Sequence, residues 1–141
     1  MPQWFGKAYK GLHLDFHTPE FLPDAIVNFD PDRWAANIVR SGADYANIFA
    51  KCHYGISYYR TAVGHIHSGL KADLLGELTS RLKAAGVGVV AYYSVNTDLR
   101  ASLEHPDWTQ VDAAGKPLLT EGRWRDVCFN SPYFRQLMLP Q

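Results

Sequence analysis

The 141-residue chain has little cysteine, no excess of either charge and no long apolar run. Its two cysteines, Cys52 and Cys128, are too few and too far apart for a disulfide framework or a zinc cluster, so we expect a reduced, cytoplasmic setting. The 14 basic residues balance the 14 acidic ones, which argues against a nucleic-acid partner. No apolar stretch approaches the roughly 20 residues that span a bilayer, and the first ten residues lack the apolar core of a secretory signal. We therefore expect neither a membrane segment nor a secreted protein.

The composition is that of one globular unit, with 47% hydrophobic and 20% charged residues. Aromatic residues make up 13%, including four Trp and eight Tyr. Aromatic rings suit the C–H-rich faces of sugars, but they suit ordinary protein cores equally well. Composition alone therefore leaves carbohydrate binding as one of two explanations.

The stretch Gly11–His17, G-L-H-L-D-F-H, alternates apolar and titratable side chains. Successive side chains of a strand point to opposite faces, so a strand here places His13, Asp15 and His17 on one face and Leu and Phe on the other. Two histidines on either side of a carboxylate are an unusual choice for a plain surface strand. The pattern predicts that this polar face lines a pocket.

The rest of the chain alternates between helical and strand patterns. A helix is expected to begin at Asp30-Pro31 and end at Ser41-Gly42, and a leucine stripe predicts a second one over 70–85, ended by Gly86. Short strands are expected at 46–51 and 87–96, the second apolar on both faces as in a parallel sheet. The segment 56–68 is expected to be a loop, because it is too polar and too aromatic to be the second strand of a tight hairpin. An irregular stretch is expected from there up to Asn130, apart from the elements above, and a helix is expected to begin at Ser131-Pro132.

This β-α-β-α-β-loop-α order predicts an α/β fold with a parallel sheet. An open doubly wound sheet and the start of a (β/α)8 (TIM) barrel both fit. The long, His- and aromatic-rich loops all follow strands, and no Gly-x-Gly-x-x-Gly follows the first strand, so the barrel is favoured and no cofactor is expected. About three β/α units are less than half a barrel. We therefore interpret residues 1–141 as one incomplete, N-terminal barrel domain, whose uncovered apolar surface could drive self-association.

Polar residues follow all three predicted strands. A barrel would bring their carboxyl ends to one rim, where the candidates are Asp15, His17, Lys51, His53, Tyr93 and Asn96. Each also has an ordinary explanation: a solvated lysine, a histidine that caps a carbonyl, a tyrosine in the core, or a turn-forming asparagine. Their coincidence at every strand end favours a site.

The run K-C-H-Y-G at Lys51–Gly55, followed by Y-Y-S at Tyr92–Ser94, resembles the retaining α-L-fucosidases and the hypothetical glycoside hydrolases related to them. The similarity runs from Gly11 to the helix start at Cys128–Tyr133. Cys52 stands where that family has the first of two histidines, and Tyr54 stands where it has an aspartate, so fucose specificity does not follow.

The resemblance implies a carbohydrate substrate, with Tyr54 added to the sugar-binding candidates. Retaining glycosidases use two carboxyl groups. By resemblance, both the nucleophile and the acid/base are expected beyond Gln141, so none of the 141 residues is assigned a catalytic role. The fragment would supply sugar-binding side chains and no metal ligand.

A metal-dependent hydrolase of the amidohydrolase type is the alternative. His13, Asp15 and His17 could ligate zinc, with further histidines available at His53, His65 and His67. Alternation places His13 one layer deeper than His17, and no orienting carboxylate accompanies the two loop histidines. A non-catalytic sugar-binding fragment is the third possibility.

Overall fold

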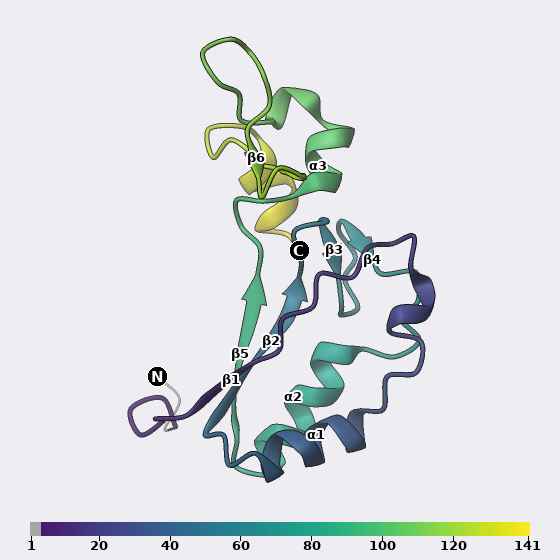
Figure 1. The fold of residues 1–141 in the computed structure, drawn as a ribbon, viewed down its shortest axis with the longest axis vertical. Coiled ribbons are helices and arrows are strands. Elements are labelled where there is room, and N and C mark those ends of the chain that lie inside the picture. Colours follow the sequence, from purple (N-terminus) through teal and green to yellow (C-terminus); the bar gives the residue numbers. More distant parts are fainter. Residues whose placement is uncertain (1–3) are drawn as a thin grey trace.

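The structure, a computed structural model, describes residues 4–141 (Figure 1). The strands are β1 (Gly11–His13), β2 (Tyr45–Lys51), β3 (Ile56–Ser57), β4 (His65–Ile66), β5 (Gly88–Tyr93), β6 (Leu119–Thr120) and β7 (Trp124–Arg125). The helices are α1 (Pro31–Arg40), α2 (Leu74–Ala84) and α3 (Leu99–Glu104), with shorter helical turns η1 (Pro23–Ala25), η2 (Pro106–Trp108) and η3 (Phe134–Met138). No helix within residues 4–141 has the length and apolar character needed to cross a membrane.

Three parallel strands form the centre of the sheet, with β2 between β1 and β5. The α1 crossover joins β1 to β2, and α2 precedes β5, so the three central strands and the two long helices follow one another in the predicted order. The first strand is shorter than expected, although the chain stays beside β2 beyond it, where the Leu14 N–H donates to the Asn47 carbonyl at 3.0 Å. Parallel strands end at the same edge of a sheet, and this edge is where the polar residues were expected to meet.

The segment 56–68 is not a plain loop. β3 pairs antiparallel with the end of β2, through Lys51 and Ser57, and β4 pairs with β3. The turn between β2 and β3 ends at Gly55, whose φ of 79° is a left-handed conformation that glycine adopts without a steric penalty. The expectation that no strand follows β2 was therefore wrong.

Both long helices begin at aspartate caps. The Asp30 carboxylate accepts a hydrogen bond from the Arg33 N–H at 3.0 Å, as expected for a helix with proline in its first turn. α2 begins at Leu74, four residues later than the leucine stripe suggested, because Asp73 caps it by accepting from the Gly76 N–H at 2.7 Å.

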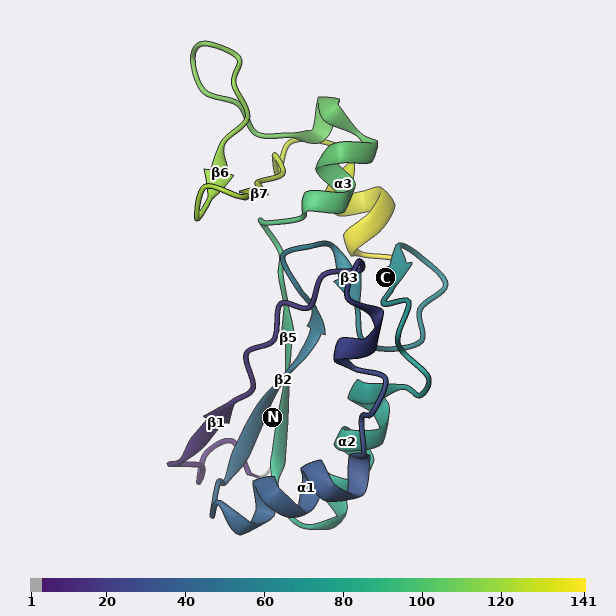
Figure 2. The ribbon, with the colours of Figure 1, turned by 45° about the vertical axis from the view of Figure 1, so that its right-hand side comes forward.

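The main core lies between the sheet and the two long helices, which cover the same face (Figures 1 and 2). Its fully buried members include Ile48 on β2 and the α2 leucines Leu74, Leu78 and Leu82. Burying one such side chain contributes about 1.5–3 kcal/mol. The apolar side chains that alternate along residues 12–16 pack against this core, which confirms the predicted assignment of the strand's two faces.

A second layer lies beyond the carboxyl ends of the strands (Figure 2). It contains α3, the β6–β7 hairpin and η3, and it has a small core of its own built around Trp108, Val127 and Tyr133. The sequence predicted irregular structure for most of this region. Its elements are short, and they depend on one another and on the strand ends for their position.

Candidate functional site

Two histidines lie against each other at the carboxyl ends of β1 and β2. The ring centroids of His17 and His53 are 4.2 Å apart, with 36° between the ring planes. The backbone N–H of His53 donates to His17 Nδ1 at 3.2 Å. The parallel register of β1 and β2 brings together two residues that are 36 positions apart in the sequence.

The hydrogen bonds assign the proton on each ring. His53 Nδ1 is 2.6 Å from Ser94 Oγ, and the Ser94 hydroxyl donates its single proton to the Thr97 carbonyl at 2.6 Å. His53 Nδ1 must therefore donate, which leaves Nε2 as an acceptor. His17 Nδ1 accepts from a backbone N–H, so its proton is on Nε2, which is 3.4 Å from the Asp15 carboxylate. The pair thus presents one donor, His17 Nε2–H, and one acceptor, His53 Nε2.

Both imidazoles favour the neutral form. Burial lowers the pKa of His17 below its usual 6.5, and the neighbouring His53 lowers it further, while Asp15 opposes this. Burial also lowers the pKa of His53, against the negative charges of Glu121 and Asp126. The donor and acceptor roles therefore persist at neutral pH.

Trp124 of the β6–β7 hairpin forms the wall of this site. Its side chain is buried, and its ring centroid lies 5.0 Å from that of His17 and 4.9 Å from that of His53. The Arg123 guanidinium lies 3.7 Å from the centroid of the Trp124 ring. Trp124 therefore covers one side of the two histidines, which stay half-buried.

The sequence analysis did not single out Trp124 or Ser94. The hairpin turns at Glu121-Gly122, where both residues have positive φ (51° and 69°). An acidic residue followed by glycine is the signal that could have predicted this turn. Ser94 was part of the Y-Y-S motif but was not treated as a partner of His53.

Lys51 lies away from the two histidines. An irregularity between Phe49 and Lys51 places Lys51 opposite Tyr93 on β5, whereas strict alternation would have put it on the same face as His53. Its ammonium is fully buried, 2.5 Å from the Asp98 carboxylate and 2.6 Å from the Tyr133 hydroxyl. Burial lowers the pKa of Lys51, while the charge of Asp98 raises it.

The structure divides the seven predicted binding residues. Asp15, His17 and His53 lie together, and the half-buried Tyr54 reaches the same cluster through its ring, 5.6 Å from that of Trp124. Tyr93 lies beside the Lys51 ammonium, and its hydroxyl donates to the Gln141 side chain at 2.5 Å. The backbone carbonyl of Asn96 accepts from the Val127 N–H at 2.8 Å, so the backbone of this residue holds the second layer.

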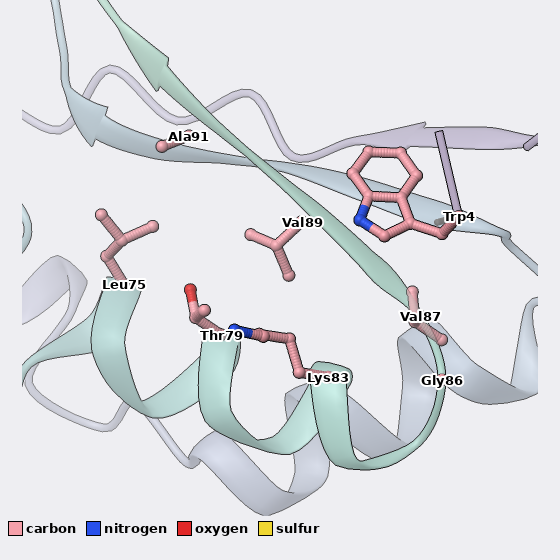
Figure 3. A pocket seen from close by; sticks show the side chains of 8 residues that line it. All are labelled: Trp4, Leu75, Thr79, Lys83, Gly86, Val87, Val89 and Ala91. Atoms are coloured by element: carbon pink, nitrogen blue, oxygen red, sulfur yellow. The ribbon is translucent and has the colours of Figure 1, made fainter. Parts of the chain in front are cut away.

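A groove of about 520 Å³ lies elsewhere, between α2 and β5 on the helix-covered face (Figure 3). Its lining is mostly apolar, with Trp4 at one end and Leu75 at the other. None of the polar residues of the strand ends lines it, so it is not part of the candidate site. Within residues 4–141, no three His, Cys, Asp or Glu side chains are grouped as a metal site, so the histidines of the amidohydrolase alternative do not form one cluster.

Comparison with known proteins points to one enzyme class. The model of a family described as Hypothetical glycosyl hydrolase 6 matches residues 30–141. An α-L-fucosidase from Dictyostelium discoideum is 31% identical over 71 residues, which cover 48% of this chain and 15% of the enzyme. The structure of α-L-fucosidase isoenzyme 2 from Paenibacillus thiaminolyticus superposes with a TM-score of 0.83 at 32% identity, covering 92% of this chain and 20% of that enzyme.

A Thermotoga maritima α-fucosidase, solved in complex with fucose, superposes with a TM-score of 0.54 at 26% identity, over 74% of this chain and 23% of that one. The 141 residues thus span about a fifth of the length of these relatives.

Proposed function

Because this chain belongs to the Hypothetical glycosyl hydrolase 6 family, we propose that residues 1–141 form the opening β/α units of a (β/α)8 barrel that hydrolyses O-glycosidic bonds, with α-L-fucosides as the first substrates to test. In this proposal the chain binds the sugar, and the catalytic carboxyl groups come from other parts of the barrel. The parallel order β1-β2-β5, with polar residues at the carboxyl ends, supports the assignment.

The single observation that carries the proposal is the donor–acceptor pair made by His17 and His53. One sugar hydroxyl can accept from His17 Nε2–H and donate to His53 Nε2, or two neighbouring hydroxyls can each use one of these atoms. A neutral pair suits an uncharged polyol, because no charge has to be desolvated when the sugar binds. Asp15, whose carboxylate is more exposed, is placed to accept from a further hydroxyl.

Lys51 and Tyr93 are not part of this proposed sugar contact, because both are committed to the buried cluster beside Asp98. Tyr54 contributes through its packing on Trp124. Self-association also stays a prediction: the apolar groove between α2 and β5 is the surface on which it would depend.

The test is hydrolysis of an aryl α-L-fucoside by the full reading frame that encodes these residues. His53→Ala should lower kcat/KM by about 10²-fold, since it removes the acceptor and leaves the sugar misplaced. His65→Ala is the matched control, because the His65 imidazole on β4 contacts Glu104 instead of the two site histidines, and its loss should leave kcat/KM unchanged. Unchanged kinetics in His53→Ala would refute the role of the pair. Activity lost with a chelator and restored by zinc would instead support the metal-dependent alternative.

A further inference from the structure

Lys51, Asp98 and Tyr133 form a buried cluster that connects three separate parts of the chain. Lys51 ends β2, Asp98 precedes α3, and Tyr133 precedes η3 in the C-terminal segment. All three side chains are at least 98% buried. The Asp98 carboxylate accepts from the Lys51 ammonium at 2.5 Å and from the Tyr133 hydroxyl at 3.0 Å, and its other oxygen accepts from the Ala101 N–H at 2.8 Å.

Stability alone is a weak explanation for this cluster. The cost of desolvating two buried charges often equals or exceeds their attraction, and apolar replacements of similar volume are frequently tolerated. The buried ion pair is better explained by the backbone segments that it holds in place. The backbone around it is therefore informative.

The backbone of the cluster touches the candidate site directly. The Lys51 carbonyl accepts from the Ser94 N–H at 3.1 Å. The N–H of Leu99, next to Asp98, donates to the His53 carbonyl at 3.0 Å. Thr97, on the other side of Asp98, supplies the carbonyl that takes the Ser94 hydroxyl proton.

The Ser94 hydroxyl has two competing acceptors. It can donate to the Thr97 carbonyl, in which case His53 Nδ1 donates to Ser94, or it can donate to His53 Nδ1, in which case the His53 proton moves to Nε2. The position of the Thr97 carbonyl decides between the two. That carbonyl is next in sequence to the residue that Lys51 and Tyr133 hold.

We propose that Lys51, Asp98 and Tyr133 are positioning residues that set the tautomer of His53, by holding the Thr97 carbonyl where it takes the Ser94 proton. The proposal rests on the proposed function, which needs His53 Nε2 as an acceptor. The cluster acts on the sugar only through His53, and its own polar atoms are too buried to touch a ligand.

The experiment reads the imidazole nitrogens of His53 by two-bond ¹⁵N–¹H NMR correlation at pH 7.5, in the full reading frame that encodes these residues. The wild-type protein should show the Nδ1–H form. Lys51→Met keeps an unbranched side chain that is one heavy atom shorter and removes the charge, whereas Tyr133→Phe keeps the ring and removes the hydroxyl. Each should move the tautomer ratio toward Nε2–H by about fivefold, the effect expected from one displaced hydrogen bond.

Leu82→Ala is the matched control. Leu82 is fully buried in α2 at the far end of the core, so its loss lowers stability without touching the Ser94–Thr97 segment. The His53 tautomer should not change in this variant. If Lys51→Met does not fold, the tautomer ratio in Tyr133→Phe alone tests the positioning role, because this variant preserves the ring and is expected to fold.

The two hypotheses fail in different ways. A wild-type His53 in the Nε2–H form overturns the assignment on which the proposed function depends. A wild-type Nδ1–H form that is equally retained in Tyr133→Phe and Lys51→Met overturns only the positioning role, and the cluster is then structural.

Discussion

Replacing Trp124 by alanine should weaken both the fold and the candidate site. The side chain is 1% exposed and contacts His17, His53 and Tyr54, with Arg123 on its ring. Truncation of a buried tryptophan costs about 3–5 kcal/mol, a large share of the roughly 5–15 kcal/mol that stabilises a typical domain. With a urea m-value of about 2 kcal/mol/M, a loss of about 4 kcal/mol lowers the unfolding midpoint by about 2 M.

The same variant should change the titration of the histidines. Burial is the largest cause of the lowered pKa of His17 and of His53, and Trp124 supplies part of that burial. In Trp124→Ala, both pKa values should rise toward 6.5, as measured by NMR titration of the imidazole protons. Histidine pKa values that stay at the wild-type level would refute the role of Trp124 as the wall of the site.

Leu82→Ala separates the two effects. It removes a fully buried side chain and should cost about 2–5 kcal/mol, as large-to-small changes of leucine in cores do. Because Leu82 lies in α2, away from the strand ends, the pKa values of His17 and His53 should not move. A rise in this control variant would show that general loosening, rather than loss of the Trp124 contact, explains the titration result.

Two further predictions concern the amino-terminal end of β5 and the pH dependence of stability. A methyl group on Gly88 would lie 2.3 Å from the Trp4 ring, so Gly88→Ala should lower the free energy of unfolding in urea by about 1–3 kcal/mol. Gly6→Ala is the control, because no atom lies within 4 Å of the added methyl group, and it should cost far less. Equal losses in the two variants would contradict the packing of Trp4 on Gly88. Three histidines have a pKa lowered by burial, namely His17, His53 and His67. Below pH 6.5 these histidines bind more protons in the unfolded chain than in the folded one, so protonation favours unfolding. The free energy of unfolding should therefore be constant above about pH 7 and fall as the pH drops through 6.5 toward the folded pKa values. Equal urea midpoints at pH 7.5 and pH 5.5 would contradict this.

Local signals in the sequence predicted much of the helical layer. An aspartate followed by proline marks the start of α1. Just after α2, Gly86 adopts a left-handed conformation that stops the helix from continuing. These signals work because capping involves residues close together in sequence. The alternation over Gly11–His17 predicted the faces of the first strand for the same reason, since one face must pack on the helices.

Other features depend on contacts that no short window contains. The β2 irregularity at Phe49–Lys51 reverses the face expected for Lys51, and β3 is only two residues long, too short to show a period. Trp124 and Tyr133 reach the strand ends from a layer whose elements are positioned by one another. The sequence therefore indicated where a site would lie, but only part of what it is made of.

The candidate site also shows why a fold shared with an enzyme of known substrate does not by itself establish the same substrate for this chain. The parallel strands account for the 4.2 Å approach of the two imidazoles, and any chain with this sheet and these histidines would bring the rings together. Which nitrogen carries the proton is decided elsewhere, by the Ser94 hydroxyl and the Thr97 carbonyl in the loop after β5. A change in that loop could exchange donor for acceptor at His53 while leaving the backbone of the sheet unaltered. If the proposed function holds, the hydroxyl pattern that the site accepts should therefore follow the loops after the strands rather than the sheet.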